Sequence, residues 1–241
     1  MRVLVTRPEP AASRTAAELR RRGHEPLVLP LAAAEHDTAA LKEALAQPHS
    51  AIAVTSAEAI RALRAVGPLP QPLFEETLYA VGDSTAKAAS GLGFRQVIAG
   101  DNDGPALARR IAEPGQSAGT AMRPLLYLAG SPRSPGFEVA LAELGVPVTV
   151  CECYQMRPRG LTAAEIAETI GDDPVDVVLL YSSESARRLF APPAAEPLSK
   201  RLLGARFLCL SEKIAATLPA RFQAHSKAAP FPNEAALLSL L

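Results

Sequence analysis

Residues 51–63 read AIAVTSAEAIRAL, and residues 177–189 read VVLLYSSESARRL. In each phrase an apolar run of strand length leads into a turn of hydroxyl side chains, and that turn opens a segment with helical spacing of its apolar residues. Aligning the phrases places Ser56 against Ser182, and the glutamates two positions later also match. One strand–turn–helix unit therefore occurs twice, and it predicts an α/β fold.

The same alternation runs along the whole chain and has further internal matches. Runs such as RVLVT, LLYLAG and RFLCLS are each followed by a helical pattern, which favours parallel sheets. ELRRRGHEPLVL (18–29) resembles ALAELGVPVTVC (140–151), and LYAVGDSTAKAA (78–89) resembles FLCLSEKIAATL (207–218). Ordered matches of this length predict two similar parallel-sheet α/β domains rather than a solenoid, whose repeats span about 20–50 residues.

The composition restricts the class of protein. The 241 residues are 48% hydrophobic and 21% charged, which is typical of a globular chain with room for two domains. The 25 basic residues balance 25 acidic ones, which argues against a nucleic-acid partner. No apolar run approaches the roughly 20 residues of a membrane span. The opening MRVLVTRPEP lacks the apolar core of a signal peptide, so we expect a cytoplasmic protein without a membrane partner.

Cysteine and histidine usage gives little sign of metal or acid–base chemistry. Cys151, Cys153 and Cys209 are odd in number and predict reduced, partly buried thiols. No second cluster of Cys or His lies near them, which argues against a metal site. The four histidines are predicted to be solvated residues of turns and loops rather than catalytic bases: His24, His36, His49 and His225.

Polar turns follow the predicted strands, where open α/β sheets bind their ligands. Each turn opens a helix whose first N–H groups are unpaired and attract carboxylates or phosphates. The candidate binding residues at these turns are Thr6, Arg7, Thr55, Ser56, Gly82, Ser84, Thr85, Gly130, Ser131, Arg133, Ser182, Ser183, Ser211 and Lys213. Helix N-capping is the alternative explanation for any single turn. As a set, the turns of two facing domains would line a cleft with anion-binding amides.

Familiar motifs of other enzyme classes are absent. The chain has neither a G-x-G-x-x-G phrase after a strand nor a phosphate-binding G-x-x-x-x-G-K-[ST] loop, and it lacks the G-x-S-x-G turn of hydrolases. Paired carboxylates of the glycosidase type are missing from the turns as well. The predicted site therefore offers many neutral donors and few strong acids or bases. Such a site suits an intrinsically reactive substrate that the protein orients.

The chain resembles the uroporphyrinogen-III synthase family over essentially its whole length. The phrases that carry the resemblance are VLVTRP, AVTSAEAI, AVGDSTAKA, LAELGVPVTVCECYQMRP and LLYSSESARRLF, and their order and spacing together are specific. The resemblance implies two α/β domains joined by a pair of antiparallel linker strands. It places residues 1–32 with 159–241 in one discontinuous domain and 38–149 in the other, with linkers at 33–37 and 150–158.

The implied activity is that of a cyclising hydro-lyase without cofactor or metal. Its substrate is the linear tetrapyrrole hydroxymethylbilane, which loses its terminal hydroxyl to give an azafulvene cation and closes through a spiro intermediate with ring D inverted. The substrate carries many carboxylates, which suit the hydroxyl-rich turns. The resemblance also implies a monomer in transient contact with the preceding deaminase. A two-domain small-anion-binding protein and an inactive synthase homologue are the alternatives.

Tyr154 matches the family's tyrosine on the second linker strand, so the resemblance implies that its phenol is the acid for the departing hydroxyl. A packed linker tyrosine with a local hydrogen bond is the alternative. The turn at 211–215 departs from the family pattern, because Ser211 and Ile214 replace a glycine and a threonine. Lys213 could supply a compensating cation there, as Arg133 could for an arginine missing from the turn after LLYLAG.

Overall fold

The structure is a computed structural model in which the chain folds as two compact units. It describes residues 1–101, 103–114, 119–192, 194, 198 and 200–241. Unit 1 comprises Met1–Ala33 and Arg157–Leu241, and unit 2 comprises Ala34–Met156. Unit 1 is therefore assembled from both ends of the chain, and unit 2 from one continuous segment. No helix among the described residues is long and apolar enough to cross a membrane.

The strands of unit 1 form a parallel sheet in the order β11-β10-β9-β1-β2. Its strands are β1 (Arg2–Val5), β2 (Glu25–Val28), β9 (Val177–Leu180), β10 (Arg206–Cys209) and β11 (Ser226–Ala228). Its helices are α1 (Ala11–Arg21), α7 (Ala163–Ile170), α8 (Ser183–Leu189), α10 (Glu212–Ala215), α11 (Ala220–Gln223) and α12 (Glu234–Leu238). Apolar side chains of α1 and α12 cover one face of the sheet, and those of α7, α8, α10 and α11 cover the other.

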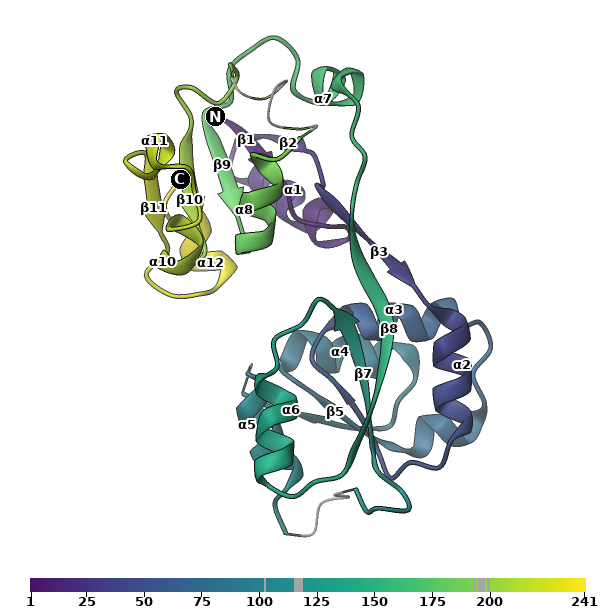
Figure 1. Cartoon of the computed structure of the whole chain (residues 1–241). Helices are drawn as coiled ribbons and strands as arrows, with labels where there is room; N and C mark the ends of the chain where they lie inside the picture. Colours follow the sequence, from purple (N-terminus) through teal and green to yellow (C-terminus); the bar gives the residue numbers. More distant parts are fainter. Residues whose placement is uncertain (102, 115–118, 193, 195–197, 199) are drawn as a thin grey trace. The chain divides into compact units, whose positions relative to one another are not determined.

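The strands of unit 2 form a sheet in the order β3-β8-β7-β4-β5-β6. They are β3 (Ala32–His36), β4 (Ile52–Val54), β5 (Thr77–Ala80), β6 (Gln96–Ala99), β7 (Leu125–Ser131) and β8 (Val148–Pro158). The helices are α2 (Thr38–Ala46), α3 (Ala57–Ala65), α4 (Asp83–Leu92), α5 (Gly104–Ile111) and α6 (Gly136–Glu143), with a 3₁₀ turn at Gln71–Glu75. Helices α5 and α6 cover one face, and α2, α3 and α4 cover the other (Figure 1).

The edge pair β3 and β8 carries the chain from one unit to the other. Leu31 accepts a hydrogen bond from the backbone N–H of Arg159, and Asp37 donates one to Cys153, which is an antiparallel pattern. The other strand pairs of the two sheets are parallel. These features confirm the predicted fold class of two parallel-sheet α/β units with an antiparallel strand pair at their junction.

The two units are similar, as the sequence matches predicted: five strands of the six-stranded sheet have the order and register of the five-stranded one, and β3 has no counterpart. Strands β4, β5, β6, β7 and β8 of unit 2 occupy the places of β9, β10, β11, β1 and β2 of unit 1. One row of paired residues crosses each sheet: Leu4, Val178 and Phe207 in unit 1, and Leu126, Ile52 and Leu78 in unit 2. Each position at the end of a strand in one unit therefore has a definable counterpart in the other.

Local sequence signals explain where the helices begin and end. Ser56 and Ser182 cap the counterpart helices α3 and α8, each accepting a hydrogen bond from a backbone N–H of the first turn. Gly23 and Gly145 follow the counterpart helices α1 and α6 with φ of 77° and 69°. That left-handed conformation favours glycine and ends both helices at the same place. The carboxyl ends of the parallel strands thus lie next to the first turns of the helices in both units.

Candidate functional site

A pocket of about 310 Å³ opens in unit 2 at the carboxyl ends of β4 and β7. It is lined by Thr55, Ser56, Val81, Asp103, Gly104, Pro105, Tyr127, Gly130, Pro132, Arg133, Ser134, Gly136, Phe137 and Tyr154. Five of these residues were candidates from sequence: Thr55, Ser56, Gly130, Arg133 and Tyr154. The pocket therefore gathers the proposed acid and residues of two predicted binding turns at the sheet edge where α/β proteins hold ligands.

Tyr154 reaches the pocket because strand β8 is irregular beside β7. Ala129 pairs with Glu152, whereas Gly130 pairs with Tyr154, so one extra residue of β8 is accommodated between them. Such a bulge redirects the side chains that follow it. A Cβ atom on Gly130 would overlap the Cζ and hydroxyl of Tyr154. The glycine is therefore what allows the phenol ring to lie across β7.

The Tyr154 phenol is buried, with 9% of the residue exposed. Burial raises the pKa of Tyr154, and a hydrogen bond with Ser56 offsets part of that rise. The phenol is thus protonated at neutral pH and can donate a hydrogen bond or a proton. Ser56 also accepts a hydrogen bond from the Glu58 backbone N–H at 3.1 Å, so the cap of α3 fixes the residue that holds the phenol.

A second phenol, that of Tyr127, lines the same pocket. Its hydroxyl lies 2.7 Å from Thr55 Oγ1, and its ring meets that of Phe137 edge-on with centroids 4.8 Å apart. Burial raises the pKa of Tyr127, and the bond to Thr55 partly offsets this. Tyr127 was not among the candidates from sequence. A signal for it exists in the run LLYLAG, because a tyrosine inside an otherwise aliphatic strand needs a polar partner.

Arg133 lines the pocket with its charge already paired. Its Nε lies 2.6 Å from Glu138, and its Nη1 lies 2.5 Å from Glu152. These bonds, that with Glu138 first, raise the pKa of the guanidinium further above its usual range. Arg133 is therefore shared between two carboxylates, and it would have to leave one of them to bind an anionic ligand.

Glu58 is buried in the first turn of α3, at the centre of a cluster of paired side chains. His36 Nε2 lies 2.8 Å from its Oε1, and Arg61 donates to its other oxygen. Burial would raise the pKa of Glu58, but the hydrogen bonds from Arg61 and His36 hold it below the ordinary value. The prediction of a solvated side chain is wrong for His36. It is also wrong for His49, which is buried with its Nδ1 2.7 Å from the carbonyl oxygen of Gln47.

The other candidates of unit 2 lie at neighbouring strand ends but do not line the pocket. Gly82 precedes α4 and takes its N-cap position, and Thr85 in the first turn is 4% exposed. Ser84 is exposed on the same turn, and Ser131 ends strand β7. The structure therefore divides the predicted turns of this unit into a pocket-lining group and a flanking group.

In unit 1 the counterpart of the pocket is occupied by the protein's own side chains. Arg7 Nη1 lies 2.9 Å from Glu234 Oε1, and its guanidinium carbon lies 4.0 Å from the centre of the Tyr181 ring. Glu234 also accepts hydrogen bonds from Thr15 and from Tyr181, the latter at 2.8 Å. Burial would raise the pKa of Glu234, but these two hydrogen bonds and the charge of Arg7 lower it.

The remaining candidates of unit 1 differ in their availability. Thr6 is buried and donates a 3.4 Å hydrogen bond to the carbonyl of Leu179. Ser182 Oγ caps α8 and donates to Ser185 Oγ at 2.9 Å. The candidates with exposed or half-buried side chains at the first turns of α8 and α10 are Ser183, Ser211 and Lys213.

The three cysteines are free, as predicted, and they are buried more completely than expected. Burial raises the pKa of Cys153 to about 12 and that of Cys209 to about 12. Within the described part of the chain, no group of three or more His, Cys, Asp or Glu side chains is placed to hold a metal ion.

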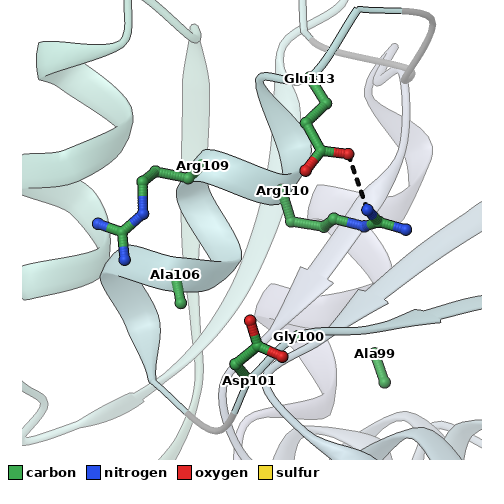
Figure 2. Close-up of a pocket in the computed structure, with 7 residues that line it drawn as sticks. All are labelled: Ala99, Gly100, Asp101, Ala106, Arg109, Arg110 and Glu113. Atoms are coloured by element: carbon green, nitrogen blue, oxygen red, sulfur yellow. Dashed lines mark hydrogen bonds and ion pairs between the residues drawn. The ribbon is translucent and has the colours of Figure 1, made fainter.

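A larger pocket of about 560 Å³ lies beside α5 at the carboxyl end of β6 (Figure 2). It is lined by Ala99, Gly100, Asp101, Ala106, Arg109, Arg110 and Glu113. Figure 2 shows Arg110 turned toward Glu113, with which it forms a 2.8 Å ion pair, while Arg109 points the other way. None of the lining residues was a candidate, and none carries a hydroxyl or phenol. The chemistry therefore favours the smaller pocket that contains Tyr154.

Comparisons with known proteins agree on one family. Residues 13–239 match the family model described as Uroporphyrinogen-III synthase HemD. The chain is similar to the crystal structure of uroporphyrinogen-III synthetase from Helicobacter pylori 26695, with a TM-score of 0.64, 17% identity, and coverage of 99% of this chain and 96% of that one.

A second solved structure supports the same fold. A mutant uroporphyrinogen III synthase from the extremely thermophilic bacterium Thermus thermophilus gives a TM-score of 0.54 at 19% identity, covering 90% of this chain and 87% of that one. No curated protein matches the chain. At these identities the likeness to solved structures supports the fold of the chain. The match to the family model is the evidence for the family to which the chain belongs.

Proposed function

The chain belongs to the uroporphyrinogen-III synthase HemD family, and from this premise we propose how its residues carry out the reaction. The activity is that of a lyase of tetrapyrrole biosynthesis, which converts linear hydroxymethylbilane to uroporphyrinogen III with loss of water and inversion of ring D. The bilane also closes without an enzyme, to the isomer that keeps ring D uninverted. The protein therefore has to promote loss of the hydroxyl and to select the folded form of the substrate.

In this proposal Tyr154 donates the proton that lets the terminal hydroxyl leave. The observation that carries it is the buried phenol of Tyr154, aimed over Gly130 into the pocket and hydrogen-bonded to Ser56. The raised pKa of Tyr154 keeps the donor protonated at neutral pH. General acid catalysis of this kind contributes about 10²–10⁴-fold, so loss of the phenol should slow the reaction without abolishing it.

The carboxylates of the substrate are assigned to exposed and half-buried groups at the strand ends. Ser84 in unit 2, and Ser183, Ser211 and Lys213 in unit 1, have accessible side chains at first helical turns. Arg7 remains a candidate, but it would have to leave Glu234 to bind the substrate. Cytoplasmic location, a monomeric state and docking on the preceding deaminase also belong to this proposal. Size-exclusion chromatography with and without the deaminase tests the last two.

The proposal is tested by isomer analysis. Hydroxymethylbilane is generated in situ from porphobilinogen by a separate deaminase, the products are oxidised, and type I and type III uroporphyrins are separated by chromatography. We expect type III product from the wild type and a rate lower by about 10²–10⁴-fold for Tyr154→Phe. Tyr79→Phe is the matched control, because Tyr79 is a buried tyrosine of β5 that does not line the pocket.

Two outcomes would contradict the proposal at different points. Full turnover by Tyr154→Phe would remove the phenol from the mechanism. Type I product alone from folded wild-type protein would mean that the chain is an inactive homologue or an anion-binding protein.

A further inference from the structure

The pocket that holds Tyr154 is surrounded by more negative than positive charge. Among the described residues that line it, the charged ones are Asp103 and Arg133. Arg133 is bonded to Glu138 and Glu152, so three carboxylates accompany one guanidinium. The effect reaches the phenol of Tyr127, whose pKa is raised more by the charge of Glu138 than it is lowered by that of Arg133. This arrangement repels a carboxylate and favours a positive charge.

The counterpart pocket in unit 1 shows what a carboxylate site on this fold requires. Asn233 caps α12 as Asp103 caps α5, through backbone N–H bonds of 2.9 and 2.6 Å. The next residue is Glu234 in unit 1 and Gly104 in unit 2. In unit 1 the Glu234 carboxylate is met by Arg7, by a phenol and by a hydroxyl, with an uncharged cap beside it. Among the described residues that line the pocket of unit 2, the helix cap is charged, and the guanidinium of Arg133 is already paired with carboxylates.

Gly104 is the difference that leaves the pocket of unit 2 open. A Cβ atom there would lie 2.9 Å from Phe137 Cβ. Thr15 is one of the residues that hold Glu234 in unit 1. Phe137 is its counterpart in unit 2, because each lies the same number of residues before the glycine that ends its helix. The open space of about 310 Å³ is at the small end of ligand sites, which span about 300–1,000 Å³, so it fits one end of a four-ring substrate.

We propose that this pocket receives the hydroxymethyl-bearing ring of the bilane, and that Asp103, Glu138 and Glu152 stabilise the cation formed there. Substrate carboxylates are excluded from the pocket and bind at the other strand ends. The inference rests on the proposed function and adds to it a defined ring position and three residues that act through their charge.

The chemical step needs this stabilisation. The bond between the terminal carbon and the hydroxyl oxygen breaks, its electron pair leaves with oxygen, and oxygen takes the Tyr154 proton and departs as water. The terminal ring is left as the azafulvene cation beside a phenolate. The substituted α-carbon of ring D bonds to the terminal carbon, which gives the spiro intermediate. The bond from that α-carbon to its bridging carbon then breaks, the bridging carbon bonds to the free α-carbon of ring D, and the proton released there returns to Tyr154. The carboxylates keep the cation favourable while the phenolate is transient.

Asp103→Asn tests the charge without removing the helix cap, because asparagine caps as well as aspartate does. We expect kcat for type III product to fall about three- to tenfold with KM unchanged, because one of the negative charges beside the cation is lost. Glu138→Gln should act in the same direction. Asp37→Asn is the matched control, because Asp37 caps α2 through a 2.9 Å bond from Ala40 N–H and does not line the pocket. Its kcat should equal that of the wild type.

The outcomes separate this inference from the function on which it rests. If the pocket instead binds a substrate carboxylate, Asp103→Asn removes a repulsion, KM falls and kcat does not, which overturns the inference. An unchanged kcat in Asp103→Asn and Glu138→Gln, together with a slow Tyr154→Phe, overturns the inference and leaves the proposed function standing. If all three variants keep full turnover, the pocket is not the site and both proposals fail.

Discussion

Gly130→Ala should displace the phenol ring of Tyr154 from its position in the pocket while the tyrosine itself is unchanged. The added methyl group would occupy the space of the Tyr154 ring, so the ring has to turn away from β7. Turnover should fall about as far as in Tyr154→Phe, by about 10²–10⁴-fold. Moving a buried ring by overpacking costs about 1–3 kcal/mol, and the smaller entropy of the unfolded alanine chain returns about 0.4–1 kcal/mol. The expected net loss of stability is about 1–2 kcal/mol.

The assay combines the rate of type III formation with urea denaturation. Gly91→Ala is the control, because a Cβ atom at Gly91 on α4 would meet nothing within 4 Å. It should keep full turnover and gain about 0.5–1 kcal/mol, since alanine is the better helix residue. In a Tyr154→Ala background the methyl group at position 130 has room, so adding Gly130→Ala should cost nothing further. Full turnover of Gly130→Ala, or additive losses in the double variant, would refute the reasoning.

Three further predictions concern stability and reactivity. The pKa of Glu234 is lowered from 4.5, so its ionised form stabilises the fold above that pH. The advantage of wild type over Glu234→Gln in urea denaturation should be full at about pH 7 and should be lost progressively as the pH falls below 4.5 through the lowered pKa. Cys153 and Cys209, each with a pKa raised to about 12, should resist iodoacetamide at about pH 8 until the protein is unfolded, as mass spectrometry can show. Tyr127→Phe should cost about 1 kcal/mol in denaturation through the lost bond to Thr55, and it should slow turnover less than Tyr154→Phe.

The repeated units could be predicted from the sequence because strands, turns and helices follow local periodicity. The phrases that begin at residues 51 and 177 became β4–α3 and β9–α8, each with its serine as helix cap. Buried strands of this kind read as continuous apolar runs, and their order along the chain favours parallel pairing. The matching apolar runs in the sequence therefore predict that the two sheets are similar.

Which residues line the pocket could not be predicted in the same way. Arg133, in the turn after β7, is paired with Glu152 on β8, and Arg7 is paired with Glu234 from a distant part of the chain. Neither pairing leaves a trace in local spacing, so both arginines looked equally available for binding. The turns themselves also look alike in sequence, because a hydroxyl that caps a helix and a hydroxyl that faces a ligand occupy the same position. Only the three-dimensional arrangement distinguishes Thr55 from Ser84.

The position of β1 between β2 and β9 has a consequence for synthesis on the ribosome. Unit 2 has all its strands once Pro158, the last residue of β8, has emerged, and a continuous unit is free to fold while translation proceeds. The first two strands emerge earliest, yet a two-stranded pair has little stability alone, so they wait for β9. Helix α12 follows every strand of unit 1 in the chain, and it brings Glu234 to Arg7. Unit 1 is thus completed by a late segment of the chain closing on an early one.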